Sequence, residues 1–348
     1  MDIKEYIHVQ KKIVPELFDL FENRYNILQT IQTHQPIGRR ALANRLNIGE
    51  RVVRTETNKL QDVNLIQILR QGMVLTEDGK EMIEKLQHVI SEIRDLSSLE
   101  ERLKKILSLE RIIIVSGDVS NNPNVLDMIG DAAANYLKTI LENGMTIGVT
   151  GGSSVSAVAR MMPLLKFPNV SVIPARGGMG KDANNQANNI AAQLATKLGG
   201  TYELLHMPDD VEGEILQALR ANPTIKRTLD KLKNLDILIY GVGRADIMAE
   251  RRSLSQEKIM LLKEKHSVAE AFGHYFNKDG EVTYRSSSVG IGLNDFKKIP
   301  YVIAVAGGAE KAKAIKATSK IRRDLILVTD ESAAKAIIED NNLKEESK

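Results

Sequence analysis

The N-terminal part of the chain shows the hydrophobic spacing of short helices, followed by two short strands. Apolar residues over Leu17–Ile31 recur at intervals of three, four and seven, which predicts an amphipathic helix. Two shorter helices are predicted over Arg39–Leu46 and Glu50–Val63, on either side of the Asn47-Ile48-Gly49 turn. Brief apolar stretches then flank Gln71-Gly72, as in a hairpin. This order of elements predicts a winged helix-turn-helix.

The next segment, Lys80 to Leu107, contains neither proline nor glycine and predicts one long helix. Its apolar residues alternate steps of four and three, which is the pattern of a coiled-coil seam: Met82, Leu86, Val89, Ile93 and Leu96. We expect this linker helix to pair with its copy in a second chain. The alternative is an amphipathic helix that packs on its own domain.

Beyond Ser108 the pattern changes to short β-branched runs that alternate with helical stretches. This alternation predicts an α/β fold, with a doubly wound, mainly parallel Rossmann-like sheet. The strands are expected at Arg111–Asp118, Met145–Thr150, Asn169–Pro174, Tyr202–His206, Asp236–Tyr240, Tyr301–Ala306 and Leu325–Thr329. A hairpin with Asp279-Gly280 at its turn is expected to be set into that sheet, within Asn277–Ile291. The predicted domains are therefore 1–78 (winged helix), 79–108 (linker helix) and 109–348 (α/β domain).

Composition narrows the function classes. The 48 lysines and arginines exceed the 45 acidic residues by only three, so the chain as a whole carries no charge excess typical of nucleic-acid or membrane binding. Cysteine is absent, which excludes disulfides, thiolate catalysis and cysteine-based metal centres. The N-terminus lacks the pattern of a signal peptide, and no apolar run approaches the length of a membrane span. We expect a cytoplasmic protein without a membrane partner.

A local charge excess does occur in the predicted helix-turn-helix. Six cations and two acidic residues over Arg39–Lys59 leave a net charge of +4. Val53, Thr57 and Leu60 share one face of the third helix, which turns the opposite face outward as in a recognition helix. The predicted DNA-binding residues are Arg39, Arg40, Arg51, Arg54, Thr55 and Asn58. The alternative is a solvated basic face on a protein-interaction module.

Three glycine-rich turns follow predicted strands of the larger domain: Thr150-Gly151-Gly152-Ser153-Ser154, Arg176-Gly177-Gly178, and Gly307-Gly308 leading to Lys311. Such turns expose backbone N–H groups and a positive helix terminus at the carboxyl edge of the sheet, where ligands bind in doubly wound folds. Hydroxyls and cations beside them suit a phosphorylated ligand. The alternative is that the glycines serve only tight turns and close helix–sheet packing.

Other motifs argue against a cofactor. Gly241-Val242-Gly243-Arg244-Ala245-Asp246 imitates a dinucleotide fingerprint, but its third glycine position is Asp246 and it does not open the first βαβ unit. The six histidines show no metal-ligand spacing. We therefore expect neither NAD nor a metal.

Two winged-helix stretches and three glycine turns together carry a resemblance to a known family: Ile37-Gly38-Arg39-Arg40, Glu50-Arg51-Val52-Val53-Arg54, Val149-Thr150-Gly151-Gly152, Pro174-Ala175-Arg176-Gly177-Gly178 and Ala304-Val305-Ala306-Gly307-Gly308. With these stretches the chain resembles the SorC family of sugar-responsive transcription regulators. Asn185-Gln186-Ala187-Asn188 and Glu270-Ala271-Phe272-Gly273 add more specific matches, and the resemblance spans almost the whole chain.

The resemblance implies a DNA-binding repressor of a glycolytic operon, with an effector domain akin to sugar-phosphate isomerases and deaminases and with fructose-1,6-bisphosphate as the inducer. The effector-binding residues that it implies are Thr150, Gly151, Gly152, Ser153, Arg176, Gln186, Arg251, Arg252, Glu270 and Lys311. Ser153-Ser154 replaces the threonine pair usual after the two glycines, which keeps the hydroxyls. The expected partners are operator DNA, the phosphosugar and further copies of the chain, as a dimer or tetramer. The alternative function is a sugar-phosphate isomerase or deaminase with an accessory helical domain, although no Asp-Gly-His stands at the Gly241 turn.

Overall fold

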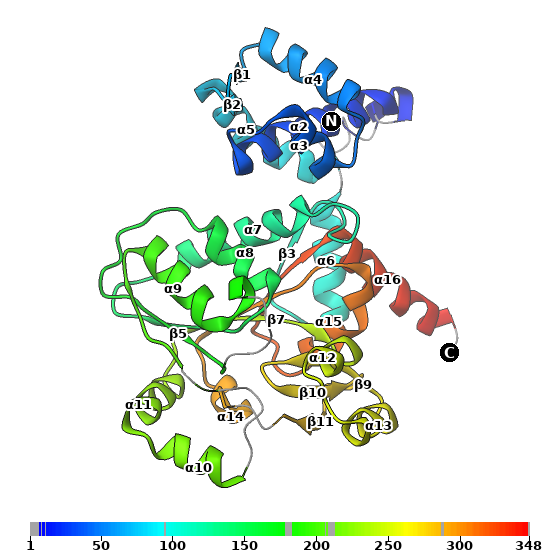
Figure 1. Cartoon of the computed structure of the whole chain (residues 1–348). Coiled ribbons are helices and arrows are strands. Elements are labelled where there is room, and N and C mark those ends of the chain that lie inside the picture. Colours follow the sequence, from blue (N-terminus) through cyan, green and yellow to red (C-terminus); the bar gives the residue numbers. More distant parts are fainter. Residues whose placement is uncertain are drawn as a thin grey trace. The chain divides into compact units, whose positions relative to one another are not determined.

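The chain forms two compact units in the computed structural model (Figure 1), which describes residues 7, 9–10, 12–93, 95–177, 183–205, 207, 213–286 and 289–346. The N-terminal unit comprises Met1–Leu99 with Val119–Val125, and the α/β unit comprises Glu100–Asp118 with Leu126–Lys348.

The N-terminal unit is a winged helix-turn-helix. Its elements are α2 (Pro15–His34), α3 (Arg39–Leu46), α4 (Glu50–Asp62), β1 (Ile66–Leu69), β2 (Gly72–Leu75) and α5 (Glu77–Ile93). Asn47 takes the left-handed conformation after α3, where asparagine is tolerated, and its N–H donates to the last turn of that helix. Strands β1 and β2 pair antiparallel, and Ile37 pairs with Met73. The predicted helices and wing are therefore present, with bounds within three residues.

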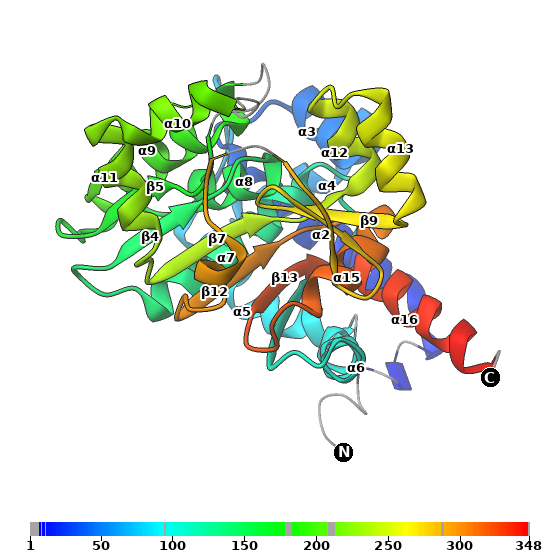
Figure 2. The same cartoon turned by 90° about the horizontal axis from the view of Figure 1, so that it is seen from below.

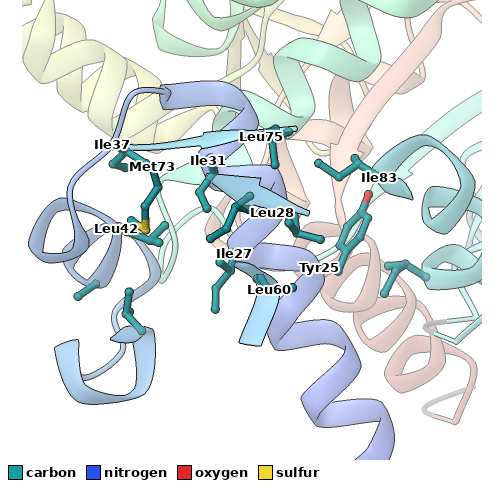
Figure 3. Packing of buried hydrophobic residues seen from close by; sticks show 14 of the residues in the cluster. Tyr25, Ile27, Leu28, Ile31, Ile37, Leu42, Leu60, Met73, Leu75 and Ile83 are labelled. Atoms are coloured by element: carbon teal, nitrogen blue, oxygen red, sulfur yellow. The ribbon is translucent and has the colours of Figure 1, made fainter. Parts of the chain in front are cut away.

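A single apolar core holds the N-terminal unit together. Figure 3 shows side chains from α2, the wing and the two shorter helices converging on one another. Ile27, Ile31 and Leu42 are fully buried. Helix α5 contributes Ile83 and Ile90 to the same core, seven residues apart and thus on one helix face.

The predicted single linker helix is interrupted. Helix α5 ends at Ile93, and α6 (Leu96–Leu107) begins after Asp95, which has a left-handed backbone with φ of 52°. Leu86 and Val89 of the predicted seam pack against the core of the N-terminal unit, while Met82 is exposed. The Ile93 side chain lies outside the described part. Since part of the seam is used within the chain, the alternative of a helix packed on its own domain applies to α5.

The α/β unit is built on a seven-stranded sheet of order β3-β13-β12-β7-β4-β5-β6, in which the pairings are parallel. The strands are β3 (Arg111–Val115), β4 (Thr146–Val149), β5 (Ser171–Pro174), β6 (Thr201–Tyr202), β7 (Ile237–Gly241), β12 (Tyr301–Val305) and β13 (Ile326–Asp330). Each of them begins within two residues of the expected position. Strand β6 is shorter than predicted, and His206 lies outside the described residues.

Helices connect these strands, with α7, α8 and α9 together on one side of the sheet in Figure 1. The connecting helices are α7 (Asn124–Ile140), α8 (Ser153–Met161), η1 (Ala183–Asn185), α9 (Ala187–Leu198), α10 (Gly213–Ala221), α11 (Pro223–Leu232), α14 (Leu293–Phe296), η2 (Ala309–Lys311) and α15 (Ala312–Ser319), and α16 (Glu331–Glu346) follows the last strand. From β4 the chain proceeds outward to β5 and β6, whereas from β7 it leads to β12 and β13 on the other side. The adjacent strands β4 and β7 thus form the topological switch point.

The predicted hairpin is present but is not part of the large sheet. Strands β10 (His274–Asn277) and β11 (Val282–Arg285) belong to a separate antiparallel sheet of order β11-β10-β9-β8, with β9 (Ser267–Ala271) and β8 (Gly243–Arg244). The expectation that the hairpin is set into the parallel sheet is wrong, because β9 supplies the antiparallel partner for β10. Helices α12 (Ala245–Arg251) and α13 (Gln256–Glu264) lie beside this small sheet in Figure 2.

Candidate functional site

A cavity of about 700 Å³ opens at the carboxyl ends of β4 and β7. This is the position at which open parallel sheets bind ligands. We call it the switch-point pocket. The ten effector-binding residues that the family resemblance implies come from segments far apart in the sequence. All of them line this pocket: Thr150, Gly151, Gly152, Ser153, Arg176, Gln186, Arg251, Arg252, Glu270 and Lys311.

The turn between β4 and α8 forms one wall of the pocket. The Gly152 N–H donates to the Asn185 carbonyl at 2.8 Å, and a Cβ on Gly151 would lie 2.8 Å from that same oxygen. Gly152 has a φ of +118°, which side chains rarely adopt. The two glycines therefore permit a close approach that positions the first turn of α8. No side chain in the described structure caps this helix, so its N–H groups and positive end suit an anion.

A buried ion cluster also lines the pocket. The Glu270 Oε1 atom accepts from Arg176 Nη1 at 2.9 Å, from Arg252 Nη2 at 2.8 Å and from the Gly273 N–H at 2.8 Å. Arg176 Nη2 also donates to Ser286 Oγ at 2.9 Å. Two guanidinium groups thus share one carboxylate, which leaves one positive charge in excess and fixes both arginines in place.

Lys311 brings a further cation from η2. Burial, together with the nearby positive charge of Arg251, holds the pKa of the Lys311 ammonium below its ordinary value, while Glu310 and Asp330 act in the opposite direction. Two like charges close enough to repel each other in a partly desolvated pocket favour a bound anion, because an anion relieves their repulsion.

Gln186 lines the pocket together with the residues of the β4–α8 turn. It occupies the N-cap position of α9, in extended backbone conformation, so its amide is presented at the start of that helix. An amide can both donate to and accept from sugar hydroxyls. The predicted turn Arg176-Gly177-Gly178 is described only in part, because Gly178 lies outside the described residues.

Sequence reasoning missed the third wall. The Gly241–Arg244 turn follows β7 and lines the pocket, as do Ile247, Met248 and Phe272. Phe272 stacks on Phe296 with ring centroids 4.6 Å apart and supplies an apolar surface. The signal was present in the sequence, since this turn ends a strand, but its use in the pocket depends on the pairing of β7 with β4.

The predicted DNA-binding residues lie on α3 and α4 of the N-terminal unit. Val53, Thr57 and Leu60 are buried, as the helix-face argument requires. The opposite side of α4 is exposed, and five of the six predicted residues are exposed there and on α3: Arg40, Arg51, Arg54, Thr55 and Asn58. Arg39 is half-buried and donates to Asn58 Oδ1 at 3.2 Å, so these two side chains support each other at the base of this surface.

One buried carboxylate lies behind that surface. Glu56 accepts from Arg24 at 2.7 Å and from Lys59 at 2.9 Å. Burial alone would raise the pKa of the Glu56 carboxyl, but the two hydrogen-bonded cations outweigh burial and lower it. Glu56 thus ties up Arg24 and Lys59 in hydrogen bonds and offsets one of their two positive charges, whereas no ion pair with Glu56 in the described part of the chain engages the exposed arginines of α4.

Within the described residues, no group of three or more potential protein ligands is arranged to hold a metal ion. None of the helices in that same part of the chain has the length and apolar character needed to span a membrane.

Family models match both units. The model described as "Putative sugar-binding domain" matches residues 91–339, and the "CggR N-terminal DNA binding domain" matches residues 20–90. The crystal structure titled "putative SorC family transcriptional regulator from Enterococcus faecalis" is 37% identical, covers 69% of this chain and 99% of its own, and superposes with a TM-score of 0.66. The chain belongs to the SorC family of transcription regulators.

Two relatives extend this SorC-family similarity over nearly the whole chain. The central glycolytic genes regulator of Priestia megaterium is 44% identical over 98% of this chain and 100% of its own, and the Bacillus subtilis protein of the same name is 42% identical over 97% and 100%. The full-length sorbitol operon regulator of Klebsiella pneumoniae shares the fold at 19% identity, with a TM-score of 0.66 over 87% of this chain and 94% of that one.

Membership of the SorC family defines the class of function. The N-terminal unit is a DNA-binding domain, and the α/β unit is a sugar-binding domain. The relatives are named transcriptional regulators, so the alternative of a sugar-phosphate isomerase or deaminase does not describe this chain.

Proposed function

We propose that this regulator is a repressor of a glycolytic operon and that fructose-1,6-bisphosphate, or a related phosphosugar, binds in the switch-point pocket as its inducer. The observation that supports this proposal is the pairing of two anion-binding features in one cavity: the uncapped first turn of α8 on one wall and buried cations on another. The names of the two central glycolytic genes regulators given above supply the link to glycolytic genes.

In this proposal the polar groups of the pocket divide the ligand between them. The β4–α8 turn, with Ser153, binds one phosphate through N–H and hydroxyl donors. Lys311 and Arg251 bind a second anionic group, and Gln186 with Glu270 contacts the sugar hydroxyls. The arginines Arg176 and Arg252 then act through the carboxylate that they hold as well as through their own charge.

On the DNA side, we propose that α4 enters the major groove with Arg51, Arg54, Thr55 and Asn58, while Arg39 and Arg40 contact the backbone near the start of α3. The protein acts as a dimer or tetramer in the cytoplasm, since paired heads match a two-fold operator. The inducer shifts the equilibrium between operator-binding states only if it binds them with different affinities.

Thermal unfolding with a series of ligands tests the inducer. We expect fructose-1,6-bisphosphate at about a hundred times its Kd to add about 2.7 kcal/mol of stability, and unphosphorylated fructose to add none. Fluorescence anisotropy on an operator selected from random duplexes should then show weaker or less cooperative binding when the bisphosphate is added. Equal responses to fructose and its phosphates, or no response to any phosphosugar, would contradict the proposal.

A further inference from the structure

Asp330, at the end of β13, is a fully buried carboxylate outside the set of residues expected to bind effector. Both of its oxygens accept from the Gly308 N–H at 3.0 Å. Oδ1 also accepts from the Ala333 N–H at 3.0 Å. Ala333 lies three residues after Asp330, so this hydrogen bond makes Asp330 the N-cap of α16. Oδ2 accepts from Ser332 Oγ at 3.1 Å. Asp330 therefore joins the start of α16 to the turn after β12.

The turn that Asp330 holds has little room to adopt another shape. A Cβ on Gly307 would lie 2.6 Å from Ile129 Cδ1 and 3.2 Å from the Asp330 carboxyl carbon. Gly308 has a φ of +100°, and its carbonyl accepts from the Lys311 N–H at 3.0 Å. The backbone that carries Lys311 into the pocket is thus fixed, through Gly308, by a side chain of the neighbouring strand.

Asp330 also contributes to the charge balance of Lys311. The charged groups that act on this ammonium come from three elements: Glu310 on η2, Asp330 on β13 and Arg251 on α12. The two carboxylates favour the protonated form, while Arg251 and burial oppose it. Removal of the Asp330 charge should therefore make Lys311 lose its proton at a lower pH.

We propose that Asp330 is a positioning residue of the switch-point pocket, which fixes the β12–η2 turn so that Lys311 faces a bound anion. The proposal rests on the proposed function for the identity of that anion, whereas the fixing of the turn is a property of the ligand-free protein. Asp330 itself does not line the pocket, so its effect on ligand passes through Gly308 and Lys311.

Two substitutions separate this role from helix capping. Asp330→Asn keeps the size of the side chain and an oxygen that can cap the helix, but it removes the charge. Its amide N–H₂ replaces Oδ2 and therefore places a donor against the Gly308 N–H, which is also a donor. Asp330→Ser keeps a good N-cap residue, but its side chain is too short to reach Gly308. Asp279→Asn is the matched control, because it removes the same charge from an exposed turn of the same unit.

The experiment measures hydrogen exchange and ligand affinity on the full chain. In both Asp330 variants we expect peptides that span the β12–η2 turn to exchange about tenfold faster without ligand, while α16 stays protected. Calorimetric Kd values for fructose-1,6-bisphosphate should rise by about tenfold or more. In Asp330→Asn the affinity should also begin to fall at a lower pH than in the wild type.

The outcomes distinguish the two proposals. Unchanged exchange of the turn in both variants would overturn the role of Asp330, even if the wild type binds the bisphosphate. Faster exchange across all of α16 and β13, with equal loss of operator binding, would also overturn it, because that result describes general destabilisation. If the turn loosens selectively but the wild type binds no phosphosugar, the inducer assignment fails and the fixing of the turn by Asp330 stands.

Discussion

At the scale of single residues, the exposed arginines of α4 are the groups most directly tied to DNA binding. We expect Arg51→Ala and Arg54→Ala each to weaken operator binding by about 1 to 3 kcal/mol, because arginine can bond guanine through two hydrogen bonds. Gel shifts with the selected operator measure the effect. Arg102→Ala, at an exposed arginine of α6, is the control and should bind like the wild type. Full affinity in both α4 variants, with normal circular dichroism, would show that α4 does not read the operator.

Lys311 is the corresponding residue on the effector side. Lys311→Ala should weaken binding of fructose-1,6-bisphosphate by about 1.5 to 3 kcal/mol, since a charged hydrogen-bond donor is lost, while operator affinity without ligand stays the same. Arg176→Ala should also abolish induction, but it removes a buried partner of Glu270 and so lowers stability as well. Lys313→Ala, two residues further along and exposed, serves as control. Induction of Lys311→Ala at wild-type ligand concentrations would place the anion site elsewhere.

The Glu56 carboxylate gives the N-terminal unit a defined response to acid. Its pKa is lowered in the folded protein, so the stability it adds is present above its unfolded pKa and is lost as the pH falls through the folded value. Glu56→Gln should cost about 1 kcal/mol at neutral pH and much less once the pH has fallen below the lowered pKa of the folded state. Thermal unfolding of the N-terminal unit at the two pH values measures this difference. An equal loss at both would show that the charge of Glu56 does not matter.

At the scale of elements, α5 shows how far hydrophobic spacing can be interpreted. The same apolar residues can serve an internal core or a partner chain, and the structure uses Ile83, Ile90, Leu86 and Val89 internally. The break at Asp95 follows no proline or glycine, so no local signal marks it. The helix-turn-helix was predictable because its glycine turn and its periodicity are local, whereas the fate of a long amphipathic helix depends on tertiary packing.

Two substitutions on α5 separate these uses. Ile90→Ala should lower the stability of the N-terminal unit by about 2 to 5 kcal/mol, because it opens a cavity in the core. Met82→Lys places a charge on the exposed side and should leave stability almost unchanged, but it should lower the oligomer mass if that side pairs with a second chain. Denaturation and sedimentation equilibrium measure the two effects. A wild-type mass for Met82→Lys would assign oligomer contacts to other surfaces.

At the scale of the whole molecule, two units with separate cores should respond separately to ligand. We expect fructose-1,6-bisphosphate to raise the unfolding transition of the α/β unit and to leave that of the N-terminal unit in place, because the pocket lies in the α/β unit alone. Differential scanning calorimetry with and without ligand resolves the two transitions. A matching upward shift of both transitions would show that the units unfold as one.

The sheet order explains what sequence alone could and could not supply at this scale. Parallel strands are short, apolar and bounded by glycine, so their positions followed from the sequence. Their neighbours did not, because the pairing of β7 with β4 joins residues about ninety positions apart, as the Thr150–Gly241 hydrogen bond shows. The Gly241–Arg244 wall was missed for that reason, while the glycine turns after β4 and β12 carried enough local signal.

The carboxylate shared by Arg176 and Arg252 has a consequence for the concentration range of the response. A ligand anion that approaches either guanidinium competes with a charge that is already bonded there, so part of its binding free energy is offset before any net affinity is gained. Half-saturation is thereby moved to higher ligand concentration than two unpaired arginines would allow. A metabolic sensor benefits from that displacement, because a site that saturates at trace levels cannot follow the rise and fall of an abundant metabolite. Under the proposed function, Glu270 thus raises the ligand concentration at which the regulator responds.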